Sequence, residues 1–211
     1  MRSCGAAGRR RFRQIDVYVY TPSVPLDALA SRLVLPLLGL LVERPAHPYE
    51  LTARLNERYR FLTVQRSSVT TLVKSLAAAG LIRAQRPQRV GKRPARRAYE
   101  LTGAGLREFR ARVSAHLEQA PAASSRFTLA LAYIGILSRA NATAVLQRRL
   151  VALRLERAAI PPLPRGRTEV HMIEVAYWKT VLDSEIGWLD ALARRITTRD
   201  IAWPLESRKG Q

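Results

Sequence analysis

The chain has 211 residues, of which 47% are hydrophobic, so it is long enough for one large domain or two small ones. Its formal net charge of +20 favours a polyanionic partner, either nucleic acid or an anionic membrane surface. A single cysteine, Cys4, excludes an intramolecular disulfide and a cysteine-based zinc site, which is typical of a cytoplasmic protein.

The positive charge lies mainly in the first half of the chain. Residues 1–99 contain 19 Lys or Arg against 5 Asp or Glu, whereas residues 169–196 contain 3 against 5. Residues 1–25 carry five arginines and are unlike a signal peptide, so we expect a basic, disordered arm. The longest apolar run, 33–42, is about half of the ~20 residues that span a bilayer, and no membrane span is expected.

Three helices follow the arm. Leucines at helical spacing predict a buried helix over 26–43 with a bend at Pro36. A second helix is expected over 48–59, with Pro48 at its first position and His47 at its cap. The third runs over 66–79, has apolar residues at i, i+3, i+4 and i+7, and ends at Gly80.

A basic hairpin comes next. Strands are expected over 81–87 and 95–101, and the segment from Arg83 to Tyr99 contains seven Lys or Arg residues and no acid. Thr102 caps a further helix that reaches residue 118. Three helices and a two-stranded hairpin predict a winged helix-turn-helix domain over 26–120, in a mainly α protein.

The remainder is expected to be helical, with helices over 126–138, 142–159 and 169–196. Residues 121–125 are a plausible joint, so a second domain is expected over 121–197, followed by a flexible tail over 198–211.

The third helix and the hairpin have different expected tasks on DNA. Short hydroxyl side chains and a lysine let a helix enter the major groove and reach base edges, while the hairpin cations bind phosphates. A solvated helix surface and a solubilising loop are the alternatives. The candidate DNA-binding residues are Arg66, Ser67, Ser68, Thr70, Thr71 and Lys74 in the third helix, Arg89, Lys92, Arg93, Arg96 and Arg97 in the hairpin, and Tyr49 in the second helix.

Catalysis, metal binding and a cofactor are not expected. The three histidines lie at unrelated places, and the chain lacks a Gly-rich phosphate loop and a nucleophile elbow. The acids of the last helix have the spacing of a solvated or interfacial face.

Several motifs in this order resemble one family. Leu37-Leu38-Gly39-Leu40-Leu41, His47-Pro48-Tyr49-Glu50-Leu51, the Gly80-Leu81-Ile82 reversal, Tyr99-Glu100-Leu101-Thr102 and a final helix around Trp188 are similar to the PadR family of transcriptional regulators. The resemblance implies a winged-helix domain, a helical C-terminal dimerisation domain, and repression by a homodimer. Many members sense small, often aromatic molecules. The chain departs from the family at Pro48, usually glycine, and at Thr70, usually tyrosine.

Aromatic and apolar residues of the C-terminal half are candidates for a dimer interface or for a pocket that binds a small hydrophobic or aromatic effector. The last helix has about 28 residues and a length of roughly 40 Å, enough for an interface between subunits. Packing of a helix interface is the alternative for the aromatic residues. The candidates are Phe127, Tyr133, Tyr177, Val181, Trp188 and Leu192.

The sequence therefore predicts a sequence-specific, homodimeric regulator of double-stranded DNA with a palindromic operator. Two other classes stay open. One is a basic RNA- or ribosome-associated protein without an operator, and the other is a peripheral membrane or partner-binding module that acts through the basic arm.

Overall fold

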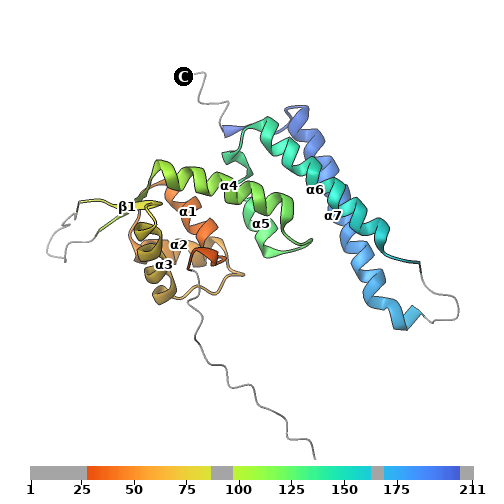
Figure 1. The fold of residues 1–211 in the computed structure, drawn as a ribbon, viewed down its shortest axis with the longest axis horizontal. Coiled ribbons are helices and arrows are strands. Elements are labelled where there is room, and N and C mark those ends of the chain that lie inside the picture. Colours follow the sequence, from red (N-terminus) through yellow and green to blue (C-terminus); the bar gives the residue numbers. More distant parts are fainter. Residues whose placement is uncertain (1–27, 87–96, 163–168, 205–211) are drawn as a thin grey trace, which may run out of the picture.

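The computed structural model describes residues 28–86, 97–162 and 169–204. The described chain is mainly helical, with one two-stranded antiparallel sheet. In Figure 1 the first helices and the hairpin form one end of the molecule, α6 and α7 lie side by side at the other, and α4 lies between them. The elements are η1 (Ala28–Ala30), α1 (Val34–Glu43), α2 (Pro48–Arg58), α3 (Arg66–Ala78), β1 (Ile82–Ala84), β2 (Tyr99–Leu101), α4 (Gly103–Gln119), α5 (Ser125–Leu131), η2 (Ile134–Ile136), α6 (Arg139–Ala159), η3 (Glu169–Met172) and α7 (Ile173–Thr197).

The helix expected over 26–43 is two elements. A short 3-10 turn, η1, is followed by a turn in which Val34 N donates to Ser31 O at 3.1 Å, and α1 begins only after it. Pro36 lies in the first turn of α1, where its missing N–H has no carbonyl to bind, so the predicted bend at Pro36 is wrong. Residues 34–41 of α1 are all buried, which makes α1 the central helix of this half.

The next two helices confirm the predicted order. Pro48 is the first residue of α2, and His47 occupies the cap position without a side-chain hydrogen bond. The apolar positions of α3, Val69, Leu72, Val73 and Leu76, are buried. Gly80 follows α3 at φ +70°, a conformation that a side chain would strain, and this is why the helix stops there.

The hairpin strands are shorter than predicted within the described residues. β1 and β2 pair with Ile82 opposite Leu101 and Ala84 opposite Tyr99, and Ala46 extends the sheet by pairing with Tyr99. Thr102 caps α4 as predicted, since its hydroxyl accepts from Gly105 N at 3.0 Å. The start of α4 packs tightly on the hairpin, because a Cβ at Gly105 would come within 2.0 Å of Leu81 O.

The C-terminal half differs most from the prediction. The helix expected over 126–138 stops at Leu131, and η2 then leads to a new helix, α6, that starts at Arg139 with Ser138 as its cap. The tail expected to be flexible from residue 198 is anchored as far as it is described. Trp203 is 4% exposed and donates its indole N–H to Leu137 O at 2.8 Å. Burial of this aromatic side chain holds the segment in place.

One continuous cluster of buried residues runs through both halves. α4 contributes Phe109, Val113 and Leu117 to it and packs against α1 on one side and α5 and α6 on the other. The expected joint at 121–125 coincides with the loop that precedes α5. α4 is therefore the element that links the winged helix to the α6 and α7 pair.

Candidate nucleic-acid interface

The exposed face of α3 carries the predicted polar side chains. Ser67, Ser68, Thr71 and Lys74 are exposed, and their side chains make no hydrogen bond with another described residue. Thr70 is half-buried, and its hydroxyl donates to Arg66 O at 2.9 Å, so its hydrogen is already used within the helix. The side chains of Ser67, Ser68, Thr71 and Lys74 thus present free donors and acceptors to a ligand in front of α3.

The N-terminus of α3 is positively charged. Its first turn contains no acid, so the unpaired backbone N–H groups and the helix dipole favour an anion there. The guanidinium of Arg66 lies 5.3 Å from the centre of the Tyr49 ring, and Tyr49 is itself 59% exposed. This stacking brings Tyr49 of α2 and Arg66 of α3 together, and it orients the cation beside the helix terminus.

A groove that the sequence did not reveal lies beside α3. It has a volume of about 500 Å³ and is lined by Ser67, Ser68 and Thr71 of α3 and by residues 28–33 around η1. The break between η1 and α1 places η1 against α3. The leucines at helical spacing predict one continuous helix over 26–43, so the break could not be recognised from the sequence.

The base of the wing contains an acid that moderates its charge. Arg83 of β1 forms an ion pair with Glu100 of β2, and Gln85 donates to the same carboxylate at 2.7 Å. Hydrogen bonds from Gln85 and Arg83 lower the pKa of Glu100. Arg86 and Arg97 are exposed and make no ion pair with a described residue, so they remain available for phosphates. Arg89, Lys92, Arg93 and Arg96 lie outside the described residues.

Two of the residues predicted for an interface or effector pocket make contacts inside their own chain. Phe127 is 5% exposed, and the Arg149 guanidinium lies 3.9 Å from its ring centre. Tyr133 packs on Phe109, and its hydroxyl meets that of Tyr59 at 2.5 Å. Burial raises the pKa of Tyr133, which keeps its phenol protonated.

The remaining candidates lie on α7. Tyr177 and Trp188 are 69% and 51% exposed, while Val181 and Leu192 are half-buried. The exposed side chains of Ile173 on α7 and of Val151 and Leu155 on α6 add to the apolar surface of this helix pair.

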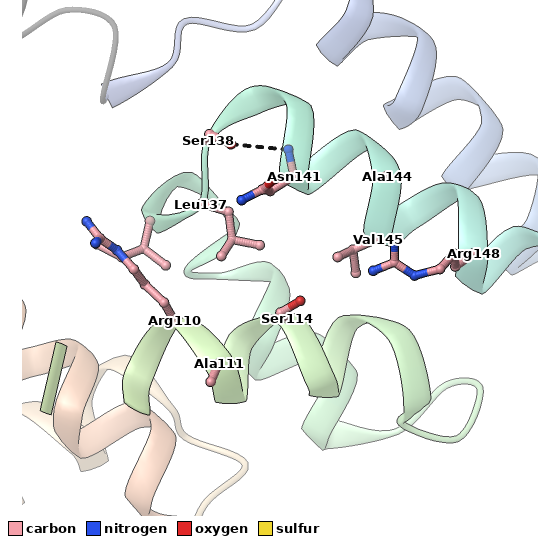
Figure 2. A pocket seen from close by; sticks show the side chains of 10 residues that line it. Arg110, Ala111, Ser114, Leu137, Ser138, Asn141, Ala144, Val145 and Arg148 are labelled. Carbon is pink, nitrogen blue, oxygen red and sulfur yellow. Dashed lines mark hydrogen bonds between the residues drawn. The ribbon is translucent and has the colours of Figure 1, made fainter. Parts of the chain in front are cut away.

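Two further grooves lie between the winged helix and the C-terminal half. The first, of about 320 Å³, is lined by Arg58, Phe109, Tyr133 and Pro204, among others. The second, of about 500 Å³, lies between α4 and α6, with Arg110 and Arg148 toward its two ends and Ser114 on its floor (Figure 2). Over the described ranges, no helix is long and apolar enough to cross a membrane, and no group of three His, Cys, Asp or Glu residues is placed to hold a metal ion.

Several solved structures are similar to this chain. Bacillus subtilis PadR bound to operator DNA is 20% identical, with 79% of this chain and 99% of that chain covered, at a TM-score of 0.40. The same protein bound to p-coumaric acid is 19% identical, with 79% of this chain and 99% of that chain covered, at a TM-score of 0.35. A PadR-like transcriptional regulator from Bacillus cereus is 14% identical, with 84% of this chain and 99% of that chain covered, at a TM-score of 0.34. No curated protein matches the chain.

A family model matches the winged helix directly. The match covers residues 37–111, which include most of α1, all of α2 and α3, the wing and the first half of α4. The resemblance that the motifs of the sequence indicated is thereby confirmed. Residues 37–111 of the chain are thus similar to the transcriptional regulator PadR-like family, whose model they match.

Proposed function

We propose that this chain is a sequence-specific repressor that binds a palindromic operator as a homodimer. The observation that carries the proposal is that one winged helix has two surfaces of different chemistry, the polar face of α3 and the basic wing. The free hydroxyls and Lys74 of α3 suit base edges, and the unpaired arginines of the wing suit phosphates.

The two surfaces have separate tasks in this proposal. α3 enters the major groove and reads bases, with Ser67, Ser68, Thr71 and Lys74 as the reading residues and Thr70 as a secondary contact. The wing anchors the flanking backbone, and Arg66, held against Tyr49, binds a phosphate at the N-terminus of α3. Two-fold symmetry then requires half-sites about 34 Å apart, or a multiple of this distance.

Three substitutions test this division. Lys74→Ala should weaken binding mainly to the preferred operator, whereas Arg93→Ala and Arg96→Ala should weaken binding to any duplex and reduce the salt dependence by about 0.9 per lost phosphate contact. Lys179→Ala on α7 is the matched control, because it removes one positive charge far from the winged helix. Fluorescence anisotropy with operator and random duplexes, at several salt concentrations, measures each effect.

Equal losses on operator and random DNA for all three variants would contradict the division of tasks. Competition with RNA tests the alternative class. Displacement of the protein by single-stranded or duplex RNA as readily as by palindromic DNA would favour an RNA- or ribosome-associated protein.

We also propose that the apolar face of α6 and α7 joins two subunits, and that a small hydrophobic or aromatic effector releases the operator. The groove beside Tyr133 is the proposed effector site, because it combines the rings of Phe109 and Tyr133 with the cation of Arg58 and touches both halves of the chain. A library of aromatic acids and neutral aromatic compounds, screened for shifts in melting temperature, tests this site. Tyr133→Leu should abolish such a shift.

A further inference from the structure

The one charged residue that is fully buried among the described residues lies where three helices meet. Arg149 of α6 is 1% exposed and forms an ion pair with Glu185 of α7, whose side chain is 10% exposed. The Arg149 Nε and Nη2 atoms lie 2.8 and 2.5 Å from Glu185 Oε1. Glu185 also accepts a bond of 2.8 Å from Ala123 N, in the loop before α5.

Arg149 also binds the C-terminal end of α4. Its Nη1 donates to Ala120 O at 2.7 Å and lies 3.4 Å from Leu117 O, and its Nη2 lies 3.4 Å from Pro121 O. These carbonyls lie at the C-terminal end of α4, where the helix dipole favours a cation. The planar guanidinium has fixed donor directions, so it holds α4, α6 and α7 in one relative orientation.

Stability alone is a weak reason for such a group. Removal of two charges from water is costly, and apolar replacements of buried ion pairs are often as stable. Unlike apolar packing, the ion pair contributes directional bonds. These bonds join α4, which follows the wing, to α6 and α7, the helix pair with the exposed apolar face.

We propose that the Arg149 and Glu185 pair is a positioning device that sets the distance between the two winged helices of the dimer and thereby the operator spacing that the protein accepts. The proposal rests on the homodimeric function proposed above. α4 has 17 residues and is roughly 25 Å long, so a rotation of about 10° at its C-terminal end moves the wing end by about 4 Å. This displacement exceeds the ~3.4 Å rise of one base pair.

The test measures affinity as a function of half-site spacing. Operators with one base pair inserted or deleted between the half-sites are compared with the preferred operator. For the wild type we expect a loss of about tenfold or more per base pair, comparable with a mismatched base pair. In Glu185→Gln and Arg149→Lys, which retain size and some hydrogen bonds, this ratio should fall to about threefold or less, mainly through weaker binding at the preferred spacing.

Matched controls make the same changes in another ion pair between α6 and α7. Arg157 and Asp183 pair at 2.8 Å but make no hydrogen bond to α4, so Arg157→Lys and Asp183→Asn should keep the wild-type spacing ratio. Arg148 and Glu118 form a second link between α4 and α6, but it is exposed, and Arg148→Lys should change the ratio less than Arg149→Lys.

A distance measurement without DNA supplies a second readout. A spin label at Glu57→Cys, in a Cys4→Ser background, reports the separation of the two winged helices in the dimer. Its distance distribution should be narrow in the wild type and broader in Glu185→Gln. Unchanged distributions and equal losses at every spacing would overturn the positioning role. A wild-type protein that is monomeric or has no spacing optimum would instead disprove the homodimeric function, and the positioning role with it.

Discussion

Gly39 lets the ring of Tyr133 lie directly on α1. A Cβ at this position would come within 2.2 Å of the ring, and the Tyr133 hydroxyl lies within reach of Pro36 O and Tyr59. The same contact explains why the helix predicted over 126–138 is broken. A continuous helix would carry Tyr133 on the next turn of α5, whereas the turn into η2 directs its ring onto the winged helix.

Gly39→Ala should therefore destabilise the protein although alanine favours a helix by about 1 kcal/mol. Overpacking against a buried ring costs typically 1–3 kcal/mol, and we expect a net loss of about 1–2 kcal/mol in the free energy of unfolding. Gly187→Ala in α7 is the matched control, because a Cβ there meets nothing within 4 Å, and it should stabilise the fold slightly. Urea unfolding measures both. A stabilised Gly39→Ala variant would disprove the contact.

His116 couples stability to pH. Burial, with the charges of Arg126 and Arg112, lowers its pKa, and its Nδ1 is buried without a hydrogen-bond partner among the described residues. The unfolded state therefore binds the proton more readily than the folded state. Stability from the neutral imidazole is fully present above the unfolded pKa of about 6.5 and is lost as the pH falls below it.

We expect the free energy of unfolding to decrease between pH 7.5 and 5.5, and His116→Gln to reduce this decrease. The range lies above the pH at which Glu100 and Glu118 titrate, since the pKa of each is lowered further by its arginine partner and hydrogen bonds. His171→Gln, at an exposed position, controls for the substitution itself. A pH dependence unchanged by His116→Gln would show that another group causes the decrease.

At the scale of elements, the wing carries less free charge at its base than its composition indicates. The acid-free segment ends at Tyr99, and the next residue, Glu100, neutralises Arg83 across the two strands. An exposed ion pair of this kind adds little stability, because water screens both charges. Its main consequence is to remove one cation from the proposed phosphate-binding surface.

Glu100→Gln should release Arg83 and strengthen binding to any duplex, with a slope of log affinity against log salt that is steeper by up to about 0.9. Glu118→Gln is the control, because it frees Arg148 at the other end of α4 with the same change in net charge. Anisotropy titrations over a range of salt concentrations distinguish the two. An equal gain from both substitutions would indicate a general effect of net charge rather than a contact by the wing.

The sequence predicts these elements well where local chemistry decides. Pro48, Gly80 and Thr102 each fix a helix end through their own backbone or side chain, and those ends are correct. It predicts poorly where distant residues decide. Arg149 has no local mark of burial in a chain with many arginines, and the short apolar run around Trp203 does not show which residues it packs against. The partners that bury both side chains appear only in three dimensions.

The candidate site divides in the same way. The exposed polar face of α3 follows directly from helical periodicity, because the buried positions fix which residues face outward. The stacking of Arg66 on Tyr49 and the groove beside η1 depend on how α2, α3 and η1 pack, and no spacing in the sequence encodes them. The proposed roles of the wing residues between Arg86 and Arg97 rest on composition alone.

At the scale of the whole molecule, the surface is polar and basic at one end and apolar at the other. The winged helix and the α6 and α7 pair lie at opposite ends of the molecule (Figure 1). The winged helix exposes hydroxyls and cations, and the helix pair exposes Tyr177, Trp188, Ile173 and Leu155. Ile173, Tyr177 and Trp188 lie on one side of α7, since steps of four and eleven residues return to nearly the same direction on a helix. A large exposed apolar patch of this kind marks an interaction site.

Tyr177→Asp should therefore convert the proposed dimer into a monomer. A charge buried in an apolar interface without a partner is costly, and loss of the second subunit removes half of the operator contacts. We expect sedimentation equilibrium to show a mass near that of one 23.7 kDa chain, and operator affinity to approach that for a single half-site.

Ala176→Asp separates the effect of position from the effect of charge. It introduces the same carboxylate one residue earlier, about 100° around the helix from Tyr177, at an exposed position outside the apolar face. This control should remain dimeric and bind the operator with nearly wild-type affinity. If both variants dissociated, the added charge and not the face would be responsible. If Tyr177→Asp stayed dimeric with full affinity, the subunits would meet elsewhere, and the long apolar stripe of α7 would serve another partner.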